Sequence, residues 1–192
     1  MLVVPTDGGP VLLAIARRAI HEAVFGRPEP PAPPDAWLRQ IAATFVSLHR
    51  SEELRGCIGS IDSTRPIAED VRYNAIASAR DDPRFPAVEP AELASVEIEV
   101  SLLSEREAVP GSTEREILDN LVPTRDGVLL THRHHRATFL PQVWKVLPDP
   151  QDFLTELKEK AGLSPNFWHR NLKIERYQVK TWQGPATPAE QE

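Results

Sequence analysis

Apolar residues recur along this chain with two spacings, one typical of helices and one typical of strands. Residues 10–25 carry Leu, Ile, Val and Phe on one helical face and Arg and Glu on the other, which predicts an amphipathic helix ending at Gly26. A second helix is predicted from residue 66 to residue 80, with Ser63 or Thr64 as its cap. Its apolar face holds mostly small side chains, so we expect this helix to lie close against a sheet.

Strand-like alternation of apolar and polar residues appears in several further segments. Residues 44–49 alternate, and residues 54–61 follow after a short turn, which predicts a β-hairpin. Residues 95–103 show the clearest alternation of all. Residues 126–140 indicate two strands around a basic turn, and residues 173–183 indicate one final strand.

The C-terminal half also contains helical signals between these strands. Thr113 and Glu116 have the spacing of a capping box, residues 141–147 suggest a short helix, and residues 149–162 suggest another that Gly162 closes. Strands and helices are mixed without a regular βαβ rhythm, and hairpins imply antiparallel pairing. The sequence therefore predicts an α+β fold, with a mixed, mainly antiparallel sheet and flanking helices.

Chain length and proline content suggest the domain organisation. The 192 residues, 41% of them hydrophobic, suit a single globular domain, which we assign to residues 10–183. Prolines crowd residues 27–35, which predicts a stiff extended connector, because proline supplies no backbone donor. Residues 184–192 are predicted to form a disordered tail.

Charge and cysteine usage exclude several classes of protein. The net charge of −6 disfavours nucleic-acid binding, because an acidic chain repels phosphate. No apolar run approaches the ~20 residues of a membrane span, and the N-terminus has no signal-peptide pattern. A lone cysteine, Cys57, forms no internal disulfide. Together these observations predict a cytoplasmic protein without membrane contact.

Cys57 lies in the segment LRGCIG, with Arg55 before it and Gly56 and Gly59 on either side. In one interpretation the thiolate acts as a nucleophile, with Arg55 as its cation and glycine N–H groups binding an anion. In the other, Cys57 is a small buried strand residue, and the glycines let the helix at 66–80 approach closely. The sequence alone leaves both interpretations open.

Histidines offer few partners for this thiol. His49 lies on the neighbouring predicted strand and is a candidate base for Cys57, although a strand-end surface histidine is the more common situation. His132, His134 and His135 share the basic turn, but interleaved arginines repel a cation and no other ligand completes a site. We therefore expect no metal and no cofactor, and a solvated turn or an anion contact here.

Seven blocks occur in an order that resembles the AMMECR-type domain family. They cover roughly residues 10–183 and read LRGCIGS, RPIAEDVRYNAIASA, DDPRFPAV, VEIEVSLLS, DGVLL, ATFLPQVW and FLTELKEKAGL. The resemblance implies an α+β fold with a larger and a smaller lobe and a cleft between them. It also implies a role as component A of the three-part AmmeMemoRadiSam system, whose other members are a Memo-like protein and a radical SAM protein. It implies no established reaction.

Two hypotheses follow for the function. In the first, the chain is an enzyme or enzyme component, and LRGCIG lines a small-molecule or modification site with Cys57 and Arg55 as its catalytic candidates. Its candidate ligand-binding residues are Gly56, Gly59, Asn74, Arg84 and Gln142. In the second, the chain is a non-catalytic binding or scaffold module for the two partner proteins, and LRGCIG shapes a docking groove.

Overall fold

The structure, a computed structural model, describes residues 3–28 and 35–187. It confirms the predicted α+β class but divides the strands between two sheets rather than one. The chain forms two compact units. The first contains residues up to Leu103 and from Lys180 onward, and the second contains Ser104–Val179. The prediction of a single two-lobed domain over residues 10–183 with a cleft stays a prediction.

The first unit is built on a four-stranded sheet with the strand order β2-β1-β3-β8. β1 is antiparallel to both of its neighbours, β2 and β3, so the predicted hairpin is confirmed. The sheet places β2 at one edge. The strands are β1 (Thr44–Arg50), β2 (Glu53–Gly59), β3 (Val96–Leu103) and β8 (Val179–Pro185).

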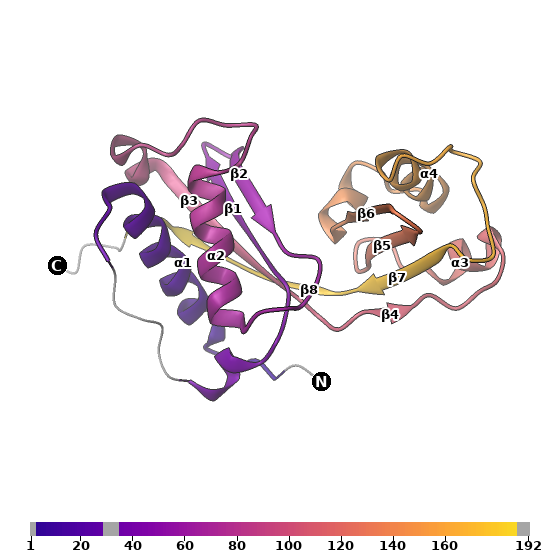
Figure 1. The fold of residues 1–192 in the computed structure, drawn as a ribbon, viewed down its shortest axis with the longest axis horizontal. Helices are drawn as coiled ribbons and strands as arrows, with labels where there is room; N and C mark the ends of the chain where they lie inside the picture. The colour runs from indigo at the N-terminus through magenta and orange to yellow at the C-terminus, as the bar shows by residue number, and fades with distance from the viewer. Residues whose placement is uncertain (1–2, 29–34, 188–192) are drawn as a thin grey trace. The chain divides into compact units, whose positions relative to one another are not determined.

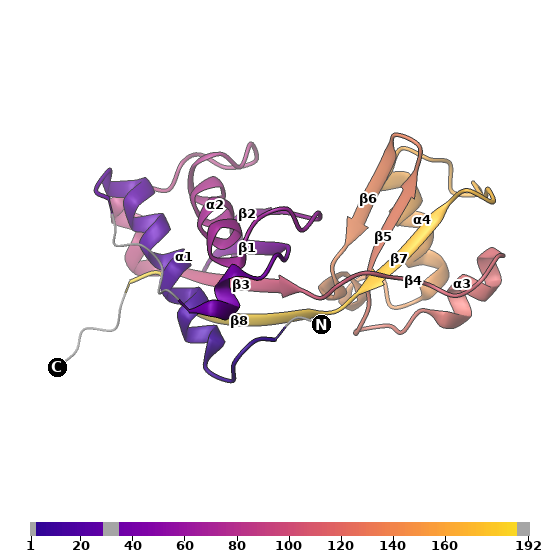
Figure 2. The same cartoon turned by 60° about the horizontal axis from the view of Figure 1, so that its bottom comes forward.

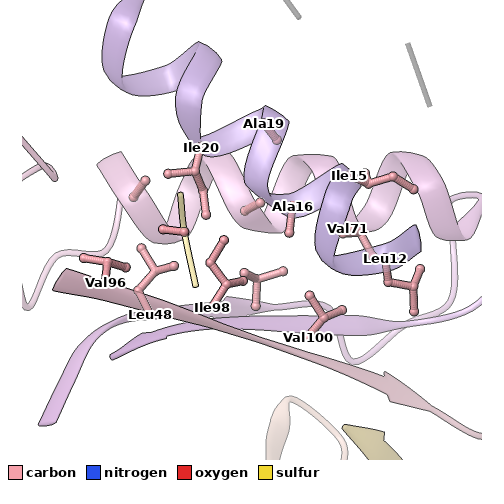
Figure 3. Packing of buried hydrophobic residues seen from close by; sticks show 14 of the residues in the cluster. Leu12, Ile15, Ala16, Ala19, Ile20, Leu48, Val71, Val96, Ile98 and Val100 are labelled. Atoms are coloured by element: carbon pink, nitrogen blue, oxygen red, sulfur yellow. The ribbon is translucent and has the colours of Figure 1, made fainter. Parts of the chain in front are cut away.

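Two helices, α1 (Gly8–Phe25) and α2 (Ile67–Arg80), cover one face of this sheet (Figure 1). Apolar side chains from both helices meet those of β1 and β3 in a hydrophobic cluster (Figure 3). Each Leu, Ile or Val side chain among them, once fully buried, contributes about 1.5–3 kcal/mol. The labelled members are Leu12, Ile15, Ala16, Ala19, Ile20, Leu48, Val71, Val96, Ile98 and Val100.

The helix ends follow the local sequence only in part. α1 ends as predicted at Gly26, whose φ of +67° is a left-handed conformation that suits glycine. The predicted Ser63 or Thr64 cap of α2 is wrong, because Pro66 is the N-cap residue and no side chain caps the helix. Instead the Ile67 amide donates to the Gln40 carbonyl at 2.9 Å, so the backbone itself satisfies this helix start.

The second unit has its own sheet, with the order β4-β7-β5-β6. Figure 2 shows β6, β5 and β7 side by side with α4 lying along them. Trp144 stacks on Phe153 with ring centroids 3.7 Å apart at the centre of its core. The elements are β4 (Glu107–Ala108), α3 (Glu114–Asn120), β5 (Gly127–His132), β6 (His135–Phe139), η3 (Pro141–Lys145), α4 (Pro150–Lys160) and β7 (Lys173–Tyr177).

Two sequence expectations at the C-terminus need correction. The single strand predicted over 173–183 is two strands, β7 and β8, that belong to different sheets. The predicted disordered tail begins too early, because β8 continues to Pro185 and Ala186 is fully buried. Residues 188–192, and residues 29–34 of the predicted connector, lie outside the described residues.

Among the residues that the structure describes, no helix has the length and apolar character needed to cross a bilayer.

Candidate functional site

Cys57 lies in the edge strand β2, directly opposite Ser47 of β1. The preceding residue, Gly56, faces α2, so the Cys57 side chain points to the sheet face that the helices leave uncovered. The thiol is partly exposed, and the Ser47 hydroxyl donates to its sulfur at 3.2 Å. A hydroxyl donor stabilises the thiolate form of a cysteine, which is its nucleophilic form.

The backbone of Cys57 is held by the loop that follows α2. The Cys57 N–H donates to the Asp82 carboxylate at 2.8 Å, and the Arg84 guanidinium donates to the Cys57 carbonyl at 3.1 Å. Arg84 also binds both oxygens of Asp82, at 2.9 and 2.7 Å. The Asp82–Arg84 pair therefore occupies hydrogen-bonding groups that an edge strand would otherwise leave unpaired.

The charges of this pair reinforce one another. The hydrogen bonds from Arg84 hold the pKa of Asp82 well below its usual range, against the opposing effect of burial. Those same bonds raise the pKa of Arg84, and the neighbouring Cys57 adds to that effect. Arg84, rather than the predicted Arg55, is thus the cation that neighbours the thiol.

Arg55 is directed to a different partner. Its guanidinium binds both carboxylate oxygens of Glu92, at 3.0 and 2.9 Å, and donates to the Pro86 carbonyl at 2.9 Å. Arg55 is buried, and its hydrogen bonds are the main cause of the lowered pKa of Glu92. Its described contacts join β2 to residues 86–92, which is a structural role for a side chain proposed from sequence as catalytic.

The glycines of the motif make room for close packing. A β-carbon on Gly56 would collide with the Ser78 carbonyl oxygen of α2, and one on Gly59 would collide with the Phe45 ring. The Ser78 hydroxyl accepts from the Ile58 N–H at 2.9 Å and lies 2.7 Å from the Val46 carbonyl. This geometry agrees with the interpretation in which the glycines let the helix approach.

Replacing Gly56 with alanine is expected to lower the free energy of unfolding by about 2 kcal/mol, because the colliding atom is backbone and moves only with the helix. Urea unfolding followed by circular dichroism measures the effect. Gly184→Ala is the control, since its nearest neighbour is the tip of the Leu13 side chain at 3.3 Å. Equal stabilities of the two variants would contradict this account of Gly56.

Asn74 faces the hairpin from α2 and is fully buried. Its amide donates to the Thr44 carbonyl at 2.9 Å and to the Asp70 carboxylate at 3.0 Å. Asp70 in turn accepts from the Thr44 N–H and hydroxyl and from the Ser60 hydroxyl. This network joins the end of β2 to α2, so Asn74 and Asp70 stabilise the LRGCIG segment from the side of the helix.

Of the other candidates from sequence, one lies in the first unit's sheet and the rest lie in the second unit. His49 pairs with Leu54 rather than Cys57, so the register does not support it as a base. Gln142 is exposed on η3 of the second unit. His132 is buried, and the His134 and His135 rings lie 4.1 Å apart. Over residues 3–28 and 35–187, no group of three or more His, Cys, Asp or Glu side chains could hold a metal ion.

Sequence reasoning missed two side chains that shape this site, Ser47 and Glu92. The Asp82–Arg84 spacing is a detectable signal, because Asp before proline favours a turn that can return a carboxylate to its own arginine. The role of Ser47 could be identified only from the register between β1 and β2, and that of Glu92 only from the path of the loop that follows α2.

Three comparisons agree on what this chain resembles. The family model described as AMMECR1 matches residues 13–182. A protein of Thermofilum pendens is 36% identical over 192 residues, which is 91% of this chain and 88% of that protein. A protein of Thermococcus onnurineus is 36% identical over 95% of this chain and 93% of its own length.

The fold has a close match among solved structures. The crystal structure of the uncharacterized protein PH0010 from Pyrococcus horikoshii superimposes with a TM-score of 0.86 at 32% sequence identity, over 96% of each chain. The similarity extends across both units rather than over one of them.

Proposed function

This chain belongs to the AMMECR1 family, and from that premise we propose that Cys57 forms a small-molecule or modification site. The observation that carries the proposal is the setting of the thiol. It is partly exposed, it accepts a hydrogen bond from Ser47, and it lies beside the Arg84 cation. Such surroundings favour an anionic ligand group next to the thiol.

The same proposal makes the chain component A of a three-part system in a cytoplasmic setting. Its partners are a Memo-like protein and a radical SAM protein, as the order of the seven sequence blocks suggests. A chemical step divided among three proteins agrees with a site that has one thiol, one hydroxyl and one cation. Among the described hydrogen bonds of Cys57 there is no general base.

Alkylation of Cys57 tests this site directly, and every label reports on it because the chain has no other cysteine. We expect the folded protein at neutral pH to react several-fold faster with iodoacetamide than a free thiol does, because of the donor and the cation at the sulfur. Ser47→Ala and Arg84→Gln are each expected to slow labelling, since each removes one stabilising group.

Arg115→Gln is the matched control, because Arg115 is exposed in the second unit and pairs only weakly with Asp119 at 3.9 Å. Labelling that occurs only after unfolding would contradict the proposal. So would a rate that neither Ser47→Ala nor Arg84→Gln changes.

A scaffold function is the second candidate, and the contacts of the motif favour it. Gly56 gives α2 room, Arg55 binds Glu92, and the Cys57 backbone binds Asp82 and Arg84. Each of these contacts shapes a rigid edge rather than a reactive group. In this case Cys57→Ser would leave binding of both partner proteins unchanged and would leave the activity of the assembled system intact, whereas the first proposal expects that activity to be lost.

A further inference from the structure

Positive charge gathers in the second unit where the β5–β6 hairpin turns and where the chain enters β7. Thr131 pairs with Arg136 on one side and with Lys173 on the other, so these two cations lie in one row across the sheet. The His132 and His169 rings lie 5.0 Å apart, which brings the segment containing Arg170 to the same end. We name this surface the basic end: Arg133, His134, Arg136, Arg170 and Lys173.

The basic end differs in the sign of its charge from the chain as a whole. Residues 131–136 and 167–173 contain no Asp or Glu, although the whole chain has a net charge of −6. Arg133, Arg170 and Lys173 are exposed and form no ion pair within the part of the chain that the structure describes. The first acidic residue of β7 is Glu175, two positions after Lys173. It pairs with Leu129.

The pKa of the buried His132 is affected by the positive charge of the basic end. Burial lowers its pKa, and the neighbouring His169 and Arg133 lower it further. Its Nδ1 atom has no hydrogen-bond partner among the described residues, and its ring contacts Phe167 and His169 edge-on. Burial and the positive charge of Arg133 thus both disfavour a charge on this histidine.

We propose that the basic end binds an acidic, extended segment of a partner protein. Its cations come from two separate segments, the hairpin tip and residues 170–173, so they are spread over a surface rather than gathered around one point. An extended peptide places alternate side chains about 6.6 Å apart on one side, which suits successive carboxylates meeting successive cations. Arginine also binds carboxylates in a bidentate manner.

The negative net charge of the chain disfavours a nucleic acid as the ligand of the basic end. A long phosphate backbone would extend past the basic end onto a chain whose overall charge is −6. A short acidic segment requires positive charge only over its own length. Binding by charge complementarity of this kind mainly raises association rates and is weakened by salt.

Fluorescence anisotropy with a short labelled peptide of alternating glutamate and serine tests the proposal on the full chain. We expect salt-sensitive binding, and a loss of affinity of about five-fold for each of Arg133→Gln and Arg170→Gln. Arg115→Gln is the matched control, because Arg115 is an exposed arginine on α3 of the same unit, and it should leave the affinity unchanged.

Four outcomes would overturn the proposal. The peptide does not bind, or it binds equally to the Arg133→Gln/Arg170→Gln double variant. A single-stranded oligonucleotide of the same charge binds more tightly than the peptide, which would mean that the surface recognises phosphate backbones. Inorganic phosphate displaces the peptide at equal concentration, which would mean a small-anion site. Circular dichroism of each variant confirms that a lost signal is not lost folding.

Discussion

Replacing Asp70 with alanine is expected to lower the free energy of unfolding by about 4 kcal/mol. Asp70 is fully buried and accepts hydrogen bonds from Thr44, Ser60, Arg65 and Asn74. The alanine variant leaves the buried Thr44 N–H without its acceptor and removes one of the acceptors of the Asn74 amide. A buried donor that loses its acceptor keeps the full cost of desolvation, which is why this loss exceeds that of an ordinary hydrogen bond.

Two further variants identify the cause of that loss. Glu69→Ala removes an exposed carboxylate from the same turn of α2 and should change stability by no more than about 0.5 kcal/mol. Asp70→Asn keeps one acceptor oxygen and removes the ion pair with Arg65, so we expect an intermediate effect. Urea unfolding at pH 7 separates the three variants. An Asp70→Ala variant as stable as Glu69→Ala would show that this network does not hold the hairpin to the helix.

Hydrophobic periodicity was sufficient to predict most helices and strands of this fold. It failed at residues 173–183, because no Gly, Pro, Asn or Asp marks a break where the chain leaves one sheet at Tyr177 and enters the other at Val179. A period of two identifies an extended segment but carries no information about which strand lies beside it. The number of sheets was therefore beyond what the pattern could predict.

The surroundings of Cys57 depend on the register between β1 and β2, which could not be predicted from the sequence. Arg50 pairs with Glu53 and His49 with Leu54, but after the bulge Leu48 pairs with Gly56 and Ser47 with Cys57. Without that extra residue Ser47 would lie opposite Gly56, and the thiol would turn to the other face of the sheet. The extra residue is Arg55, so residues 54–57 do not form a regular strand.

The glycines of LRGCIG were a sequence signal for this bulge. Glycine inside a strand pattern indicates a bulge or a close approach by another group, and both occur here. The pattern left open whether a ligand or the helix at 66–80 approaches the glycines, and the structure places α2 against Gly56. Close packing by the helix explains Gly56, and the proposed ligand remains on the opposite face with the thiol.

The second large effect concerns the carboxylate that holds the Cys57 backbone. Asp82→Ala is expected to lower the free energy of unfolding at pH 7 by about 3 kcal/mol, because it removes the acceptor of the Cys57 N–H and the partner of Arg84. Arg84 is half-exposed, so solvent screens the ion pair and the hydrogen bonds supply most of this difference.

Acid should abolish this difference in a defined range of pH. The folded-state pKa of Asp82 lies well below its usual value near 3.8, so its stabilising effect is complete above that value and is lost as pH falls through the folded pKa. The gap between the wild type and Asp82→Ala should therefore stay constant from pH 7 to about pH 4 and then shrink. Asp81→Ala, which changes the exposed neighbouring carboxylate, is the control and should show no such gap. A gap that narrows already between pH 7 and pH 5 would assign the titration to another group and leave the Asp82–Arg84 pair a minor contact of the strand that carries the thiol.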